Sequence, residues 1–324
     1  MNWPRPRQLA RWRNVAAIPR DERLVAQLAG ARLSMTLFRR AAAALPGSRT
    51  ALAALRGVLR LTLTAWHIAR GVYIVGAVFP RLNTAQKQVR IQRWSCAVLR
   101  ALGVSVNLQG RLDAGAQMLV ANHVSWLDVI VLQSLIPQAR FVSKAEVQHW
   151  PLIGRLVVGA GTFFVERARP RQTRNAVDAI AAALAAGETV AVFPEGTTSD
   201  GRAVLPFRAS LLQAALLAAV PVRPVALRYA DAHHPVSRCA PYVDDDTLLG
   251  SLWRTANARD LMVSVHALAA HATSACHRRP LAAAVRLAIQ AALDADPPMQ
   301  QADCMNQLAV ARAGLRAATP RGDS

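Results

Sequence analysis

The chain has 324 residues, a formal net charge of +20, 53% hydrophobic residues and 18% charged residues. This much apolar sequence excludes a disordered polybasic protein, and the lack of repeated uncharged stretches of about 18 or more residues excludes a multi-pass membrane protein. Residues 1–100 carry a net charge of +16 and residues 101–324 only +4, so the first hundred are expected to face a lipid surface or a nucleic acid.

The N-terminal residues 1–27 are rich in arginine, with Trp3 and Trp12 interleaved. They are expected to form either a solvated tail or an interfacial segment anchored by the tryptophans. No apolar stretch follows them that would make a secretory signal, which favours a cytoplasmic protein. The four cysteines have neither the spacing of a disulfide framework nor that of a zinc site, so we expect no metal.

The segment Ser48–Phe79 is expected to form one long helix, because Pro46 and Gly47 break the preceding pattern and Ser48 is a suitable N-cap. Its residues are mostly apolar, and its basic positions fall within an arc of about 80° on a helical wheel. These positions are Arg49, Arg56, Arg60, His67 and Arg70.

Three placements of this helix are open. It can lie in a membrane interface with its arginines at lipid phosphates, pack on the rest of the protein with its arginines in water, or cross the bilayer once with snorkelling arginines. We favour the first, because charge-free runs of about ten residues are too short to span a bilayer unaided. The expected membrane contacts, on the cytoplasmic face of the inner membrane, are Arg49, Arg56, Arg60 and Arg70.

Residues 84–102 predict a second basic amphipathic helix, which ends at Gly103. Beyond it, short β-branched runs alternate with helical patterns, which predicts an α/β domain with a mostly parallel sheet flanked by helices. The expected strands are VSVNLQG, QMLVAN, ARFVS, TFFV, TVAVF, VPVRPVAL and LMVSVHAL, and the expected helices are Ser125–Leu135, Gln172–Ala186, Ala209–Ala219 and Leu281–Leu293. Residues 231–258 are expected to be a loop. We therefore divide the chain into a membrane-association region (1–103), an α/β domain (104–296) and a polar tail (297–324).

The first candidate site, NHVSWLD, directly follows a predicted strand, so His123 is expected at the strand's C-terminal edge, where α/β folds build their sites. Ser125 can cap the next helix and place Asp128 in its first turn, near His123. A histidine whose second nitrogen is held by a carboxylate is suited to act as a general base. The alternative is an ordinary turn in which Asp128 only favours the helix N-terminus.

The second candidate, FPEGTTS, also follows a strand. Gly196 permits a tight turn there, and the hydroxyls and backbone N–H groups beside it can face an anion or a carbonyl oxygen. Glu195 can bind a hydroxyl or a cation. Two further blocks, GTFFVER ending at Arg167 and VPVRPVA, are unremarkable alone, and an ordinary polar loop remains the alternative for FPEGTTS.

In this order and at these intervals the four blocks resemble those of the glycerolipid acyltransferase family, the 1-acyl-sn-glycerol-3-phosphate acyltransferase-like enzymes with an HxxxxD block, over about residues 105–230. The resemblance implies an α/β domain preceded by a helical membrane-binding segment. It implies His123 as catalytic base and Asp128 as its orienting partner. The expected substrate-binding residues are Asn122, Arg167, Glu195, Gly196 and Thr197.

The chain departs from the family pattern near the expected acceptor. Members with a glycerol phosphate acceptor commonly have an arginine soon after FPEG and a later Phe-Lys-x-Gly, whereas Thr198 and Phe207-Arg208-Ala209-Ser210 stand here. Fewer fixed positive charges weaken the case for a phosphomonoester, and the pattern is more similar to the bacterial branch that includes lyso-ornithine-lipid acyltransferases. Lysophosphatidate and lyso-ornithine lipid both stay open as acceptors.

The expected reaction moves an acyl group from acyl-CoA or acyl-ACP to a lysolipid hydroxyl at an anionic membrane. It needs no metal, cofactor or covalent enzyme nucleophile, and backbone N–H groups after His123 or beside Gly196 could stabilise the oxyanion. A thioester or lipid hydrolase is the alternative, although the chain has no G-x-S-x-G elbow. A nucleic-acid partner is not expected, because the basic region is interleaved with aliphatic runs rather than stacking aromatics.

Overall fold

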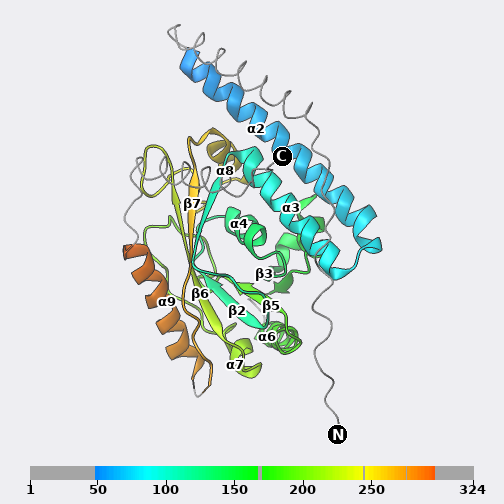
Figure 1. The fold of residues 1–324 in the computed structure, drawn as a ribbon, viewed down its shortest axis with the longest axis vertical. Coiled ribbons are helices and arrows are strands. Elements are labelled where there is room, and N and C mark those ends of the chain that lie inside the picture. The colour runs from blue at the N-terminus through cyan, green and yellow to red at the C-terminus, as the bar shows by residue number, and fades with distance from the viewer. Residues whose placement is uncertain (1–47, 167–169, 244, 275, 296–324) are drawn as a thin grey trace, which may run out of the picture. The chain divides into compact units, whose positions relative to one another are not determined.

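The computed structural model describes residues 48–166, 170–243, 245–274 and 276–295 (Figure 1). The predictions for residues 1–27, for Arg167 and for the polar tail beyond residue 296 lie outside these ranges. One compact unit begins at Leu55 and contains all the strands, and the unit before it is described only from Ser48 to Ala54.

A seven-stranded sheet forms the centre of the larger unit, with the strand order β1-β7-β6-β2-β5-β3-β4. Every pairing is parallel except that of β6 with β7, which confirms the predicted mostly parallel α/β fold. All seven expected strands are present: β1 (Ser105–Gln109), β2 (Gln117–Ala121), β3 (Arg140–Lys144), β4 (Phe163–Val165), β5 (Thr189–Val192), β6 (Val222–Ala230) and β7 (Met262–Ala267).

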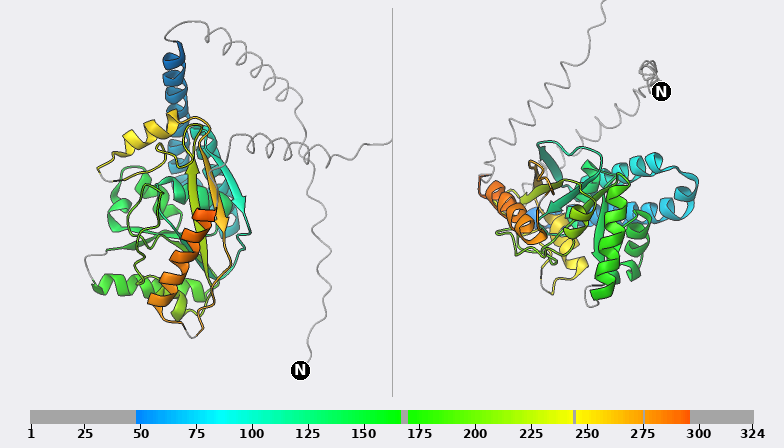
Figure 2. Two further views of the ribbon diagram at one scale, coloured as in Figure 1. Left: turned by 90° about the vertical axis from the view of Figure 1, so that its left-hand side faces the viewer. Right: turned by 90° about the horizontal axis from the view of Figure 1, so that it is seen from below.

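Both faces of the sheet are covered, because successive side chains of a strand point to opposite faces. In β2, Leu119 and Ala121 join one apolar core, while Met118 and Val120 join a second core across the sheet. The first core includes residues of α3 (Thr84–Leu102), α4 (Leu127–Leu135) and α8 (Leu248–Asn257), and the second includes residues of α6 (Pro170–Ala185), α7 (Gln213–Leu217) and α9 (Arg278–Ala295). Figures 1 and 2 show α3 and α9 on opposite sides of the strands.

The helix α2 (Ser48–Tyr73) continues through a π-helical turn, Ile74–Val78, and a 3₁₀ turn, Phe79–Arg81. Its exposed face is apolar and aromatic, since positions 55, 59, 66 and 73 fall on one side of a helical wheel. Trp66 is 64% exposed and Tyr73 is 68% exposed, and the other exposed apolar residues of the helix are Leu55, Val58, Leu59 and Leu63. By length and composition alone, Ala51–Arg81 is long and apolar enough to cross a membrane.

Two arginines of α2 that we expected at lipid phosphates bind protein carbonyls instead. Arg60 Nη1 donates to the carbonyl oxygens of Ala256 and Ala258, at 3.0 and 2.9 Å, and Arg56 Nη2 donates to that of Asn257 at 2.9 Å. These carbonyls end α8, where a helix lacks acceptors for its last C=O groups and favours positive charge. Arg70 is exposed and stays a predicted membrane contact. The side chain of Arg49 is outside the described residues.

The prediction of a loop over residues 231–258 is wrong at its end, where α8 forms. Leu248, Leu252 and Ala256 recur at helical spacing within this segment, a signal that the loop prediction did not use. The helix also contains Gly250 and buries two small polar residues, Ser251 and Thr255. Thr247 caps its start by accepting the N–H of Gly250 at 3.1 Å, and α2 supplies cations at its other end. Two short helical segments between β3 and β4, Ala145–His149 and α5 (Ile153–Gly159), were not predicted from the sequence.

Candidate active site

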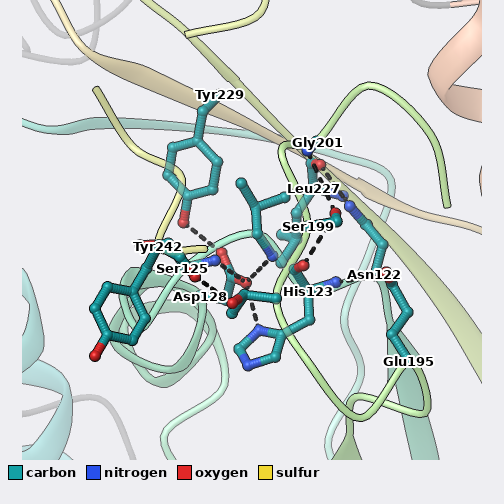
Figure 3. A network of polar contacts seen from close by, with 12 residues as sticks. Asn122, His123, Ser125, Asp128, Glu195, Ser199, Gly201, Leu227, Tyr229 and Tyr242 are labelled. Carbon is teal, nitrogen blue, oxygen red and sulfur yellow. Dashed lines mark hydrogen bonds and ion pairs between the residues drawn. The ribbon is translucent and has the colours of Figure 1, made fainter. Parts of the chain in front are cut away.

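The two candidate motifs meet at the C-terminal ends of neighbouring strands. Strands β2 and β5 pair in parallel, so the loops that follow them leave the same edge of the sheet. His123 follows β2 by two residues and Glu195 follows β5 by three, and the backbone N–H of His123 donates to Glu195 Oε1 at 2.8 Å (Figure 3). Two of the four sequence blocks that carry the family resemblance, NHVSWLD and FPEGTTS, therefore lie in one site.

His123 and Asp128 form the expected pair, with 2.8 Å between Nδ1 and Oδ2. The carboxylate of Asp128 is fully buried, and Oδ2 also accepts the backbone N–H groups of Val124 at 2.7 Å and Ser125 at 3.0 Å (Figure 3). Because three donors converge on one oxygen, Asp128 holds both the imidazole and the turn that carries it. We expected Ser125 to cap the helix, but α4 has Trp126 at its N-cap and no side-chain cap, and the Asp128 carboxylate instead holds the turn that precedes the helix.

The geometry leaves the second ring nitrogen of His123 available for chemistry. A hydrogen on Nδ1 is assigned by its bond to the carboxylate, which leaves a lone pair on Nε2. The imidazole stacks on Phe193, with ring centroids 4.2 Å apart and an interplanar angle of 16°. Its side chain is 20% exposed, so Nε2 can receive a proton from a bound hydroxyl.

Glu195 is 4% exposed, and both of its carboxylate oxygens are occupied. Besides the bond from His123, Oε2 accepts the N–H of Leu205 at 3.2 Å. Burial raises the pKa of Glu195 to about 7, and the backbone hydrogen bonds from His123 and Leu205 oppose that rise. Glu195 therefore braces the backbone of the base against a second loop, and direct binding of substrate by its carboxylate stays a prediction.

The rest of the FPEGTTS turn also fixes the peptide of His123. The N–H and the hydroxyl of Ser199 both approach the His123 carbonyl oxygen, at 2.8 and 3.2 Å. The Thr198 hydroxyl donates to the Tyr242 carbonyl, and the N–H of Tyr242 donates to the Val124 carbonyl at 3.0 Å. The two loops and the segment around Tyr242 thus hold one another in register.

The other expected substrate-binding residues differ in their placement. Asn122 is 2% exposed, and its amide bonds to the N–H and C=O of Leu227 at 2.7 and 2.9 Å, so it joins the end of β2 to β6, and substrate binding by Asn122 stays a prediction. Gly196 has a positive φ of 78°, as the tight turn requires. Thr197 is exposed beside it.

Sequence reasoning missed two residues that lie behind this site. Tyr229 of β6 donates its phenol hydrogen to Asp128 Oδ1 at 2.7 Å. Arg286 of α9 donates to the carbonyls of Val204 and Leu205, in the loop that also contacts Glu195. Neither lies in a motif, and each is brought in by an element far away in the chain.

Within the residues that the structure describes, no group of three or more His, Cys, Asp or Glu side chains is arranged to hold a metal ion. The site therefore offers a base, its carboxylate partner and backbone donors as its chemical groups.

Comparison with known proteins places this geometry among acyl-transfer enzymes. Residues 104–228 match the sequence model of a family described as Acyltransferase. The lyso-ornithine lipid O-acyltransferase of Pseudomonas aeruginosa is 34% identical over 248 residues, which are 75% of this chain and 95% of that protein. The 1-acyl-sn-glycerol-3-phosphate acyltransferase of Neisseria gonorrhoeae is 30% identical over 211 residues, which are 65% of this chain and 81% of that protein.

A solved structure is similar in fold. The crystal structure of the 1-acyl-sn-glycerophosphate acyltransferase PlsC from Thermotoga maritima has a TM-score of 0.53 and 20% sequence identity, and the match covers 74% of this chain and 96% of that chain.

Proposed function

The chain belongs to the acyltransferase family, and from this premise we propose that it moves a fatty acyl group from acyl-CoA or acyl-ACP to the hydroxyl of a lysolipid at a membrane surface. It is an O-acyltransferase of lipid biosynthesis. The observation that supports the proposed chemistry is the 2.8 Å contact between His123 Nδ1 and a fully buried Asp128.

The proposed reaction is a single displacement on the thioester. The lysolipid oxygen attacks the carbonyl carbon while His123 Nε2 takes its proton, and Asp128 stabilises the imidazolium that forms. The tetrahedral intermediate then releases the thiolate as the C–S bond breaks, and the proton on Nε2 passes to the departing sulfur. The products are an acylated lipid and a free thiol, and His123 returns to its starting state.

The backbone amide of Thr197, directly after Gly196, is the better source of an oxyanion site, since the N–H of Gly196 itself donates to the Phe193 carbonyl at 3.2 Å. The N–H groups of Val124 and Ser125, at the start of the helix after His123, already donate to Asp128. They cannot serve the thioester oxygen without releasing the carboxylate that orients the base. Thr197 is exposed, and it belongs to the turn whose Ser199 contacts the His123 carbonyl.

Lyso-ornithine lipid is the acceptor that we propose first, with lysophosphatidate as the competing substrate. Thr198 stands where a cation is common in phosphate-binding relatives, and its hydroxyl donates a hydrogen bond to the Tyr242 carbonyl. A phosphomonoester carries up to two negative charges and needs fixed cations. A panel of the two lysolipids with acyl-CoA and acyl-ACP, read by mass spectrometry, tests this choice. Faster turnover of lysophosphatidate would reverse it.

The apolar face of α2 is proposed as the membrane contact, since Leu59, Trp66 and Tyr73 are exposed there while the arginines at 56 and 60 face the protein. Trp and Tyr favour the headgroup level of a bilayer. Flotation of the Leu59→Glu/Trp66→Glu variant with liposomes should show reduced binding. The matched control carries two charges on another exposed apolar pair, Leu217→Glu and Leu287→Glu, and should still float.

The catalytic assignment is tested with His123→Ala in full-length protein and liposomes. The variant should bind membranes as the wild type does and lose at least about 10²-fold in acyl transfer, the usual contribution of a general base. Product analysis separates the rival class: an acylated lipid indicates a transferase and free fatty acid a hydrolase. Near-normal turnover by H123A would refute the role of His123.

A further inference from the structure

Tyr229 lies on the part of β6 that extends past the end of its pairing with β2. Strand β6 pairs with β2 as far as Val225, opposite Ala121, and then continues to Ala230. The amide side chain of Asn122 prolongs the contact by bonding to the backbone of Leu227. Leu227 and Tyr229 share a face of the strand, because they are two residues apart. This arrangement carries the Tyr229 phenol beside the loop that holds His123.

The phenol serves the oxygen of Asp128 that His123 does not use. Tyr229 Oη donates to Oδ1 at 2.7 Å, whereas His123 and two backbone N–H groups converge on Oδ2 (Figure 3). Tyr229 is 2% exposed and Asp128 is fully buried. Burial, and the negative carboxylate beside it, raise the pKa of the Tyr229 phenol well above 10, so the phenol keeps its proton and remains a donor.

We propose that Tyr229 is a positioning residue for acyl transfer, which acts on the base through Asp128. The inference rests on the proposed function, in which His123 is the base. The torsion that rotates a carboxylate about its Cβ–Cγ bond is soft, and a bond to Oδ1 restrains it so that Oδ2 stays directed at the imidazole. A hydrogen bond to a charged group is also stronger than one between neutral groups.

A purely structural role for Tyr229 would have a different signature. A tyrosine in a core needs an acceptor for its hydroxyl, and Asp128 could merely provide one. In that case loss of the hydroxyl would alter stability without a separate effect on the base. The test therefore compares turnover, apparent affinity and pH dependence with the folded fraction.

The variant is Tyr229→Phe, which keeps the ring and removes only the donor. The matched control is Thr189→Val, which likewise removes one buried hydroxyl donor, here one that bonds to the Gly115 carbonyl at 2.6 Å at the end of β5 away from the site. Acyl transfer is measured on full-length protein in liposomes, next to H123A, with the unfolding midpoint of each variant.

For Y229F we expect kcat to fall on the order of tenfold, the effect of losing a hydrogen bond to a charged group, with KM unchanged within about twofold. The acid limb of the kcat/KM profile should move to higher pH, because a carboxylate with one donor fewer holds the imidazolium proton more firmly. Asp128, Glu195 and Tyr229 are titratable groups that meet His123 or its partner carboxylate. T189V should match the wild type in all three quantities.

Two results would overturn the inference. One is wild-type kcat and an unshifted acid limb in Y229F. The other is a fall in activity that follows only the loss of folded protein, again with an unshifted limb. If H123A itself retains turnover, the proposed function fails first, so the failures of the two proposals are distinguishable.

Discussion

Replacement of Asp128 offers the sharpest test of how the site is built, because this carboxylate supports both the fold and the base. It accepts four hydrogen bonds: those of His123, Val124 and Ser125 at Oδ2, and that of Tyr229 at Oδ1. Asp128→Ala would leave two backbone N–H groups and one phenol buried without this acceptor. At about 1–2 kcal/mol each, the free energy of unfolding should fall by about 3–6 kcal/mol.

Asp128→Asn separates the two roles. The asparagine keeps a carbonyl oxygen for the amides of the turn, so the stability loss should be no more than about 1–2 kcal/mol. It lacks the charge that stabilises the imidazolium, and kcat should fall by about 10²- to 10⁴-fold, the contribution of general base catalysis. The assays are urea unfolding followed by fluorescence and acyl transfer to lysolipid in liposomes.

The two variants should differ in stability and not in activity. D128N must be folded and nearly inactive, while D128A must be both unstable and inactive. A folded D128N with kcat within about threefold of the wild type would refute the assignment of Asp128 as partner of the base. A D128A variant as stable as D128N would refute the count of stranded donors.

Three further predictions concern the surroundings of the site. Because the pKa of Glu195 is raised to about 7, the folded protein keeps a proton that the unfolded chain releases above its usual carboxyl pKa. The free energy of unfolding of the wild type should therefore fall as the pH rises from about 5 to 7, by up to about 3 kcal/mol. Urea unfolding of Glu195→Gln should show a smaller dependence on pH, and the same dependence in both proteins would contradict the raised pKa. Arg60→Ala removes two hydrogen bonds to the α8 carbonyls and should lower the free energy of unfolding by about 1–3 kcal/mol, with faster proteolysis of α8. Replacement of the exposed Arg70 by alanine should change the free energy of unfolding little. Gly103 has a φ of 74°, and an added Cβ would lie 2.1 Å from Arg60 Nη2, so Gly103→Ala should lower the free energy of unfolding by about 1–3 kcal/mol. The double variant with R60A should lose less stability than the two single variants added together, and strict additivity would show that the two residues do not touch.

The difference between α2 as predicted and as found has a simple physical cause. The helical wheel correctly gathers Arg56 and Arg60 on one side, but it cannot say what that side faces. The short charge-free runs then favoured a helix in the membrane interface, with its arginines at lipid phosphates. In the folded chain the arginines instead bind the carbonyl end of α8, which carries partial negative charge and lies about 200 residues away in sequence. The apolar stripe, not the arginine stripe, is then the surface left for a membrane.

Local sequence patterns by themselves determined the seven strands, the helix at 84–102 and the pairing of His123 with Asp128. They also determined the helix predicted at 281–293, which is two to three residues longer at each end in the structure. Each depends on residues close together in the chain: β-branched runs, a helical period, or two side chains separated by one turn. These patterns also placed His123 at the C-terminal edge of a strand, although they did not determine which atoms of other loops contact it.

Only the tertiary structure decided how the site is braced, because those contacts join elements that no local signal connects. Tyr229 reaches Asp128 from β6, and the amide of Asn122 bonds to the β6 backbone at Leu227. Glu195 binds the peptide of the base across 72 positions in the chain. The same holds for the carbonyl end of α8, which is stabilised by cations of another helix.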